Sequence, residues 1–143
     1  MELLRDKICI ITGAARGIGR SIAEVFASEG AIVYALDVIE GAESDGILPS
    51  ICDICDFSAV RNRVMDIKKA HGRIDVLVNC AGIVTYELLS MIDFDKLRKM
   101  FDVNVIALIN LMQLCSRVMS RQKSGSIINI ASMVGKQGAA GQL

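Results

Sequence analysis

The chain has 143 residues, of which 52% are hydrophobic and 22% charged, and its acidic and basic residues balance to a formal net charge of zero. This composition is typical of a globular protein, and we expect one domain over residues 1–143. Without a basic cluster, a long uncharged apolar run or an apolar leader, the sequence disfavours nucleic-acid and membrane partners and favours the cytoplasm. Five scattered cysteines favour reduced thiols, and no metal site is expected because Cys52-x-x-Cys55 has no second ligand pair and His71 is the only histidine.

Apolar runs alternate with helical periods along the first half of the chain. Lys7–Thr12 and Ala31–Leu36 are continuous apolar runs, as expected for parallel strands that are buried on both faces. Between them, apolar residues recur at helical spacing as far as Gly30. Val38–Pro49 is polar and contains glycine, so we expect a loop there, followed by a short third strand at Ile51–Ile54.

The same alternation continues in the second half. A helix around residues 60–67 precedes a strand at Ile74–Val78, and a long helix is expected from about Asp93 to about Ser120, before a strand at Ser126–Ala131. This order predicts an α/β fold: a Rossmann-type doubly wound parallel sheet with strand order 3-2-1-4-5, ending after the fifth strand. The long helix carries more apolar residues than one face holds, so we expect it to be buried on two sides.

A glycine-rich turn separates the first strand from the first helix. Glycines permit a tight turn and let the backbone approach a pyrophosphate, while the helix N-terminus offers free N–H groups and the positive end of its dipole. An ordinary glycine-rich loop is the alternative interpretation. The candidate phosphate-binding residues are Gly13, Ala15, Arg16, Gly17, Ile18 and Gly19.

Asp37 follows the second strand, about 20 residues beyond the turn, where a carboxylate can accept hydrogen bonds from an adenosine ribose. A 2′-phosphate at the same place would meet like-charge repulsion, so Asp37 favours NAD over NADP. Arg16 favours the opposite choice, because a guanidinium near the turn can pair with a 2′-phosphate. We favour NAD, because the carboxylate should lie at the ribose itself, and keep NADP as the alternative.

Several motifs, in this order, resemble the short-chain dehydrogenase/reductase family. The spacing Gly13-x-x-x-Gly17-x-Gly19 is similar to the turn of that family, and the wording of Thr12–Gly19 and of the segment around Ser132 is most similar to its 3-oxoacyl-(acyl-carrier-protein) reductases and their paralogues. The further matches are Asp53-Ile54, Asn79-Cys80-Ala81-Gly82, Asn104 and Ser132.

The resemblance implies an oxidoreductase that transfers a hydride between NAD(P)(H) and a small carbonyl or secondary alcohol substrate. It implies that Asp53 and Ile54 contact adenine, that Asn79, Ala81 and Gly82 belong to the cofactor site, and that Ser132 hydrogen-bonds the substrate oxygen while Asn104 helps order a proton-relay water. For Ser132 the alternative is a strand-end hydroxyl that bonds the local backbone, and for Asn104 a polar residue that faces solvent. The resemblance also implies a homo-oligomer through the helix around 93–120.

The chain departs from the family pattern at its end. The Tyr-x-x-x-Lys pair of the family should follow Ser132 at a spacing that takes it past Leu143, and neither Tyr34 nor Tyr86 has lysine four positions on. Without that proton donor we expect the chain as given to be inactive or nearly so, since losing general acid–base help costs about 10²–10⁴-fold in rate. An inactive dinucleotide-binding or oligomerisation fragment is therefore the alternative function. The substrate itself is not readable, and the short link between Asp37 and Asp53 predicts that the helix between the second and third strands is shortened or absent.

Overall fold

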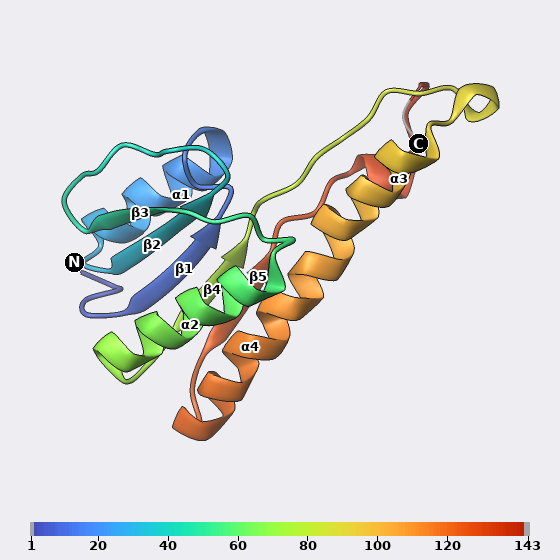
Figure 1. The fold of residues 1–143 in the computed structure, drawn as a ribbon. Helices are drawn as coiled ribbons and strands as arrows, with labels where there is room; N and C mark the ends of the chain where they lie inside the picture. Colours follow the sequence, from blue (N-terminus) through green and yellow to red (C-terminus); the bar gives the residue numbers. More distant parts are fainter. Residues whose placement is uncertain (1, 142–143) are drawn as a thin grey trace.

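The computed structural model describes residues 2–141, which fold into one sheet of parallel strands flanked by helices (Figure 1). The strand order is β3-β2-β1-β4-β5, which confirms the predicted fold class and order. In chain order the elements are β1 (Ile8–Thr12), α1 (Gly17–Ser28), β2 (Ile32–Asp37), β3 (Ile47–Ile51), α2 (Phe57–His71), β4 (Val76–Asn79), the 3-10 turn η1 (Leu89–Met91), α3 (Phe94–Phe101), the π-helical turn η2 (Asp102–Ile106), α4 (Ala107–Gln122), β5 (Ser126–Asn129) and α5 (Val134–Gln137).

Two apolar cores lie on opposite faces of the sheet, because successive side chains of a strand point to opposite faces. In β1, Ile8 and Ile10 belong to the core that α2 and α4 cover, and Cys9 and Ile11 belong to the core that α1 covers. All five residues of β1 are buried, as the continuous apolar run predicts. Burying one such isoleucine contributes about 1.5–3 kcal/mol, so this central strand anchors the turn that follows it.

The third strand lies earlier than predicted, at Ile47–Ile51 instead of Ile51–Ile54, and the expected loop ends correspondingly sooner. Its register with β2 runs from the pair Val33 and Ile47 to the pair Asp37 and Ile51. Pro49, which suggested a loop, is tolerated because β3 is an edge strand, where a missing N–H need not break the sheet. No helix separates β2 from β3, as the short link predicts.

The long helix predicted from about Asp93 to about Ser120 is present as α3, η2 and α4, which together form one rod (Figure 1). The side chain of Asp93 accepts the N–H groups of Asp95 and Lys96, so it is the N-cap of the rod. By length and composition alone the rod, Phe94–Gln122, could cross a membrane. However, Ala107, Leu111 and Cys115 of α4 are fully buried against the sheet, as in the core helix of a globular domain.

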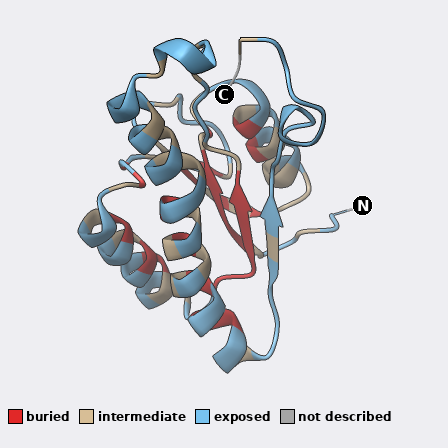
Figure 2. Ribbon diagram, turned by 90° about the vertical axis from the view of Figure 1, so that its right-hand side faces the viewer, coloured by how far each residue is buried: buried red, intermediate tan, exposed pale blue. Residues whose placement is uncertain are grey.

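The opposite face of the rod is exposed within the single chain (Figure 2). Phe101, Val105 and Ile109 share that face, and 55%, 39% and 53% of their respective surfaces are exposed. We expected the long helix to be buried on two sides, but the described chain buries only the side that packs on the sheet. β5 is similarly open, and Ile128 in it is 40% exposed.

Candidate functional site

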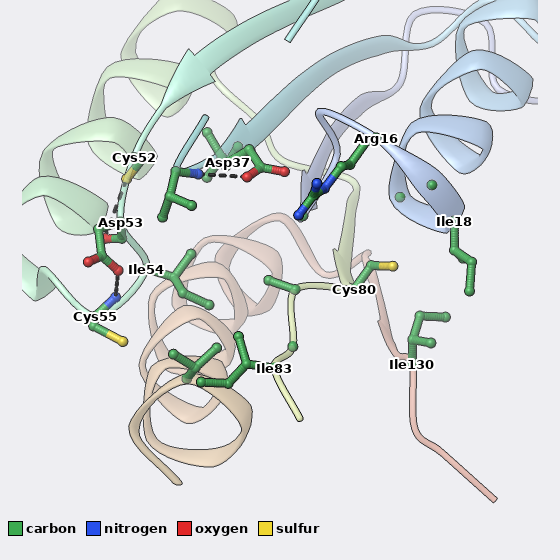
Figure 3. Close-up of a pocket in the computed structure, with 18 of the residues that line it drawn as sticks. Arg16, Ile18, Asp37, Cys52, Asp53, Ile54, Cys55, Cys80, Ile83 and Ile130 are labelled. Atoms are coloured by element: carbon green, nitrogen blue, oxygen red, sulfur yellow. Dashed lines mark hydrogen bonds between the residues drawn. The ribbon is translucent and has the colours of Figure 1, made fainter. Parts of the chain in front are cut away.

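A pocket of about 850 Å³ lies at the carboxyl ends of the strands. Its walls come from the β1–α1 turn, the end of β2, the segment after β3, the segment after β4, the rod at the end of α3 and the start of η2, and Ile130 after β5 (Figure 3). The volume is in the range of small-molecule sites, and this edge of a doubly wound sheet is where such sites form. Of the predicted cofactor residues, those lining the pocket are Gly13, Arg16, Gly17, Ile18, Gly19, Asp37, Asp53, Ile54, Ala81 and Gly82.

The glycines of the β1–α1 turn bring the backbone close to its neighbours. A Cβ on Gly13 would lie 2.8 Å from the Cα of Ala81, and a Cβ on Gly19 would lie 2.1 Å from the carbonyl oxygen of Gly13. Gly17 differs, because a Cβ there would meet nothing within 4 Å. Its φ of +59° nevertheless disfavours any other residue, and it lines the pocket at the first residue of α1. The turn therefore forms a backbone cradle that is open on the pocket side.

The start of α1 carries no side-chain cap. Arg16 is the N-cap residue, in an extended conformation, and its side chain makes no capping hydrogen bond. The first N–H groups of a helix lack intrahelical partners, and here they lie beside the pocket. The side chain of Arg16 points into the pocket, toward Asp37 (Figure 3). An anion placed here would meet the helix dipole, free N–H groups and a guanidinium.

Asp37 ends β2 with its carboxylate at the pocket, held by the backbone. Its Oδ2 accepts the N–H of Ala15 at 3.0 Å, and its Oδ1 accepts the N–H groups of Val38 at 2.8 Å and Ile39 at 3.3 Å. Ala15 does not line the pocket, but its N–H fixes the carboxylate of Asp37, which does. A carboxylate has about four lone-pair sites, so Asp37 keeps capacity for a further hydroxyl donor.

Thr12, which was not among the predicted site residues, connects the segment after β4 to the glycine-rich turn. Its buried Oγ1 accepts the N–H groups of Cys80 and Ala81, both at 3.1 Å. Asn79 lies outside the pocket lining and is 2% exposed. Its Nδ2 donates to Oδ1 of Asn129 at 2.9 Å, which joins β4 to β5. Thr12 and Asn79 thus shape the pocket wall from behind.

The segment after β3 closes the other end of the pocket. Ile54 is 7% exposed and forms part of the wall (Figure 3). Asp53 lines the same end, and its Oδ1 accepts the N–H of Cys55 at 2.9 Å. An apolar side chain beside a carboxylate is a surface on which a flat heterocycle with N–H donors can rest.

The two predicted catalytic residues lie outside the pocket lining, and their side chains bond to the backbone. Asn104, in the π-helical turn, accepts the N–H of Ile83 at 2.9 Å with Oδ1 and donates to the carbonyl of the same residue at 2.8 Å with Nδ2. Ser132 follows β5, is exposed, and its Oγ accepts the N–H of Val134 at 3.2 Å. Asn104 therefore holds the segment after β4 to the rod, and Ser132 bonds the local backbone.

Three thiols also line the pocket, those of Cys52, Cys55 and Cys80. Burial raises the pKa of each above its ordinary value, which keeps the thiols protonated and weakly nucleophilic at neutral pH. Cys9 and Cys115 are fully buried, and burial raises the pKa of each to about 12. All five are free thiols, as expected. Among residues 2–141 no three cysteine, histidine or acidic side chains are grouped to hold a metal ion.

The family model for short chain dehydrogenases matches residues 7–143. A 3-oxoacyl-(acyl-carrier-protein) reductase of Thermotoga maritima is 36% identical over 97% of this chain and 61% of its own length. A galactitol 2-dehydrogenase of Agrobacterium fabrum is 34% identical over 96% of this chain and 57% of its own length.

A solved structure agrees with the sequence matches. The ligand-free aldohexose dehydrogenase of Thermoplasma acidophilum superimposes with a TM-score of 0.86 at 36% identity, covering 90% of this chain and 50% of that one. The chain thus spans about 61% or less of the length of these relatives. A family model that accounts for nearly every residue and a closely superimposing structure agree with the glycine cradle and the strand order. The chain belongs to the short chain dehydrogenase family.

Proposed function

We propose that this chain holds the NAD(H) of an oxidoreductase that acts on a carbonyl or secondary alcohol group of a small molecule. The observation that carries the proposal is the single pocket that joins the glycine cradle, Asp37 and Ile54 at the carboxyl edge of the sheet. The cradle fits a diphosphate, because at Gly17 the side chain is missing where the backbone faces open space. A pocket of about 850 Å³ whose wall is built by six chain segments suits a dinucleotide better than a mononucleotide.

In this proposal each part of the wall has one task. The N–H groups at Gly17 and Ile18, with the dipole of α1, would bind the diphosphate, and Asp37 would accept the adenosine ribose hydroxyls. Ile54 would pack on the adenine, and the Ala81–Gly82 segment would line the nicotinamide end. When bound, the nicotinamide ring supplies the hydride acceptor or donor.

We favour NAD over NADP because the position of the carboxylate of Asp37 is fixed. Three backbone N–H groups hold it at the pocket, so it cannot rotate away from a 2′-phosphate without losing them. The negative charges of the Asp37 carboxylate and of a 2′-phosphate would repel each other in this partly desolvated site. Arg16 points toward Asp37 and favours NADP, because its guanidinium could pair with a 2′-phosphate. However, this long, exposed side chain can move toward solvent.

For proton transfer, neither tyrosine of the chain lies where it could act as the donor. Tyr34 bonds Nε2 of His71 at 2.8 Å, and Tyr86 is 74% exposed. Neither lines the pocket. Ser132 and Asn104 are proposed to orient a substrate oxygen and a water, respectively, once a tyrosine and a lysine complete the site. We therefore propose that the 143-residue chain binds the dinucleotide with little or no turnover.

A cofactor titration tests this proposal. NADH and NADPH are titrated by calorimetry against the unaltered chain and against Asp37→Asn, and reduction of a 3-oxoacyl thioester is assayed alongside. The expected results are tighter binding of NADH than of NADPH, and a ratio that shrinks about tenfold in Asp37→Asn because the charge that repels the 2′-phosphate is gone. The unaltered chain should show no more than trace turnover.

The matched control is Asp66→Asn, which removes an exposed carboxylate on α2, far from the pocket lining. It should leave both affinities unchanged. Failure of the unaltered chain to bind either dinucleotide would sink the proposed function, and tighter binding of NADPH would reverse the choice of cofactor.

The exposed stripe of Phe101, Val105 and Ile109 supports a second role for the same chain, as a partner in a homo-oligomer. A stripe of large apolar side chains along a helix is a typical contact surface. This role accords with dinucleotide binding, because the stripe lies on the face of the rod opposite to Ala107 and Leu111, which pack on the sheet.

A further inference from the structure

The connection between β2 and β3 is a loop, residues 38–46, that packs against α1 and the β1–α1 turn. It packs closely there: a Cβ on Gly46 would lie 3.1 Å from the Cβ of Ala27 in α1, and a Cβ on Gly41 would lie 3.4 Å from the Cα of Ala15 in the glycine-rich turn. The loop begins at Val38, a pocket residue whose N–H donates to Asp37. It therefore touches both the turn and the carboxylate of the proposed dinucleotide site.

Arg20 of α1 is hydrogen-bonded to this loop. Its Nη1 donates to the carbonyl of Ala42 at 2.6 Å and its Nη2 to Oγ of Ser44 at 3.2 Å. Its Nε donates to Oε1 of Glu24 at 2.8 Å, four residues along the same helix. The side chain of Arg20 is only 17% exposed, whereas that of Glu24 is 56% exposed. All three guanidinium nitrogens thus have partners, and two of those partners are on the loop.

The planar guanidinium explains why an arginine occupies this position. Its fixed fork of donors satisfies two loop oxygens and a carboxylate at once, which a lysine ammonium on a flexible stem does less well. Besides these bonds, the loop packs at Gly41 and Gly46 and makes backbone hydrogen bonds near its ends. One such bond is donated by the N–H of Val33 to the carbonyl of Gly46.

We propose that Arg20 is a positioning residue for the adenosine end of the site: it pins the 38–46 loop, and through the loop it fixes the orientation of Asp37. This inference rests on the proposed dinucleotide function, and Arg20 itself does not line the pocket. The step from loop to carboxylate is short, because the N–H groups of Val38 and Ile39 both donate to Asp37. Loosening the loop should therefore loosen the carboxylate.

The test uses the 143-residue chain with Arg20→Met and Arg20→Lys. Amide hydrogen exchange should become faster over residues 38–46 in Arg20→Met, with little change in β1 and β4, and NADH affinity measured by calorimetry should fall about tenfold. Arg20→Lys should recover part of both effects, because an ammonium can still donate to the carbonyl of Ala42. A role confined to global stability would instead change exchange throughout the sheet.

Glu24→Gln is the matched control, because it removes the ion pair of Arg20 while leaving both loop bonds. It should change neither loop exchange nor NADH affinity, whereas Ser44→Ala should cause a smaller version of the Arg20→Met effects. Unchanged loop exchange in Arg20→Met, or faster exchange with unaltered NADH affinity, would overturn the inference while leaving the proposed function intact. Absence of NADH binding by the unaltered chain would overturn the proposed function, and the inference with it.

Discussion

Gly17 and Gly72 are a matched pair of glycines that separates backbone strain from ligand binding. Their φ angles are +59° and +73°, and a Cβ on either would meet nothing within 4 Å. Gly17 lines the pocket at the start of α1, whereas Gly72 caps the C-terminus of α2. At the scale of single residues, both need a left-handed backbone, and only Gly17 borders the proposed diphosphate site.

Replacing each glycine by alanine should cost a similar free energy of unfolding, about 1 kcal/mol, because both positions need a left-handed backbone. Only Gly17→Ala should also abolish NADH binding, since its methyl group would project where the diphosphate approaches the backbone. Urea denaturation and NADH titration of both variants check this. Equal NADH affinities in the two variants would contradict the placement of the diphosphate.

The hydrogen bonds between distant segments at the site could not be predicted from the sequence. The glycines, Asp37 and Ile54 are recognisable because each follows a strand, and strand ends meet at one edge of a parallel sheet. The bond of Asn104 to Ile83 joins residues whose proximity depends on how the rod crosses the sheet, which no local pattern encodes. Thr12 could have been found, because a hydroxyl directly before a glycine turn has backbone N–H groups within reach.

At the scale of elements, Asp75 ties the start of β4 to the start of β1. Its side chain is 5% exposed; Oδ2 accepts the N–H of Ile8 at 3.0 Å, and Arg73 donates to both carboxylate oxygens. Burial by itself would raise the pKa of Asp75, but the hydrogen bonds from Arg73 and Ile8, with the charges of Arg73 and Lys7, outweigh it and hold the pKa below its ordinary value.

A carboxylate whose pKa is lower in the folded state stabilises the fold above its unfolded pKa of about 3.9, and this stabilisation is lost as the pH falls through the folded value. Asp75→Asn should therefore lower the free energy of unfolding by about 1–3 kcal/mol at pH 7. The difference from the unaltered chain should narrow below about pH 4. Urea denaturation at several pH values, from below about 4 to about 7, measures this difference in unfolding free energy. Asp45→Asn is the control, because Asp45 is exposed. If the difference in unfolding free energy between Asp75→Asn and the unaltered chain stayed constant with pH, the stabilising role of the charged Asp75 carboxylate would be contradicted.

The strand order was predictable at this scale, and the position of β3 was not. Strands β1, β2 and β4 are buried on both faces, so their sequences are continuous apolar runs that stand out from their surroundings. β3 is an edge strand, with Leu48 43% exposed and Pro49 in its middle, so burial imposes less of a pattern on its sequence. Cys52 and Ile54, which lie in the predicted range, are buried because they belong to the core that α2 and α4 cover, and they also line the pocket.

At the scale of the whole molecule, the exposed face of the rod predicts self-association. Ile109, 53% exposed, lies within the stripe of Phe101, Val105 and Ile109, and Met65, 50% exposed, lies on α2 outside it. We expect the chain to sediment as a dimer or larger assembly, because pairing two stripes removes their apolar surface from water. Ile109→Glu should shift it to the monomer, since a charge would be buried in that contact.

Sedimentation velocity over a range of concentrations measures the assembly, with Met65→Glu as the control for adding a charge to an exposed apolar site. A monomeric unaltered chain, or an equal response of the two variants, would refute association through the rod. The dinucleotide titrations should be unaffected by Ile109→Glu, because this residue does not line the pocket.

The π-helical turn η2 has a consequence for the phase of the rod. Such a turn holds one residue more than an α-helical turn would, so the five residues Asp102–Ile106 turn the rod about as far as four α-helical residues would. One residue corresponds to a rotation of about 100° about the helix axis. With α4 fixed against the sheet, α-helical geometry over the same five residues would rotate α3 by about this angle and carry Lys99, which borders the pocket, away from it. The extra residue thus sets which way the free end of the rod faces.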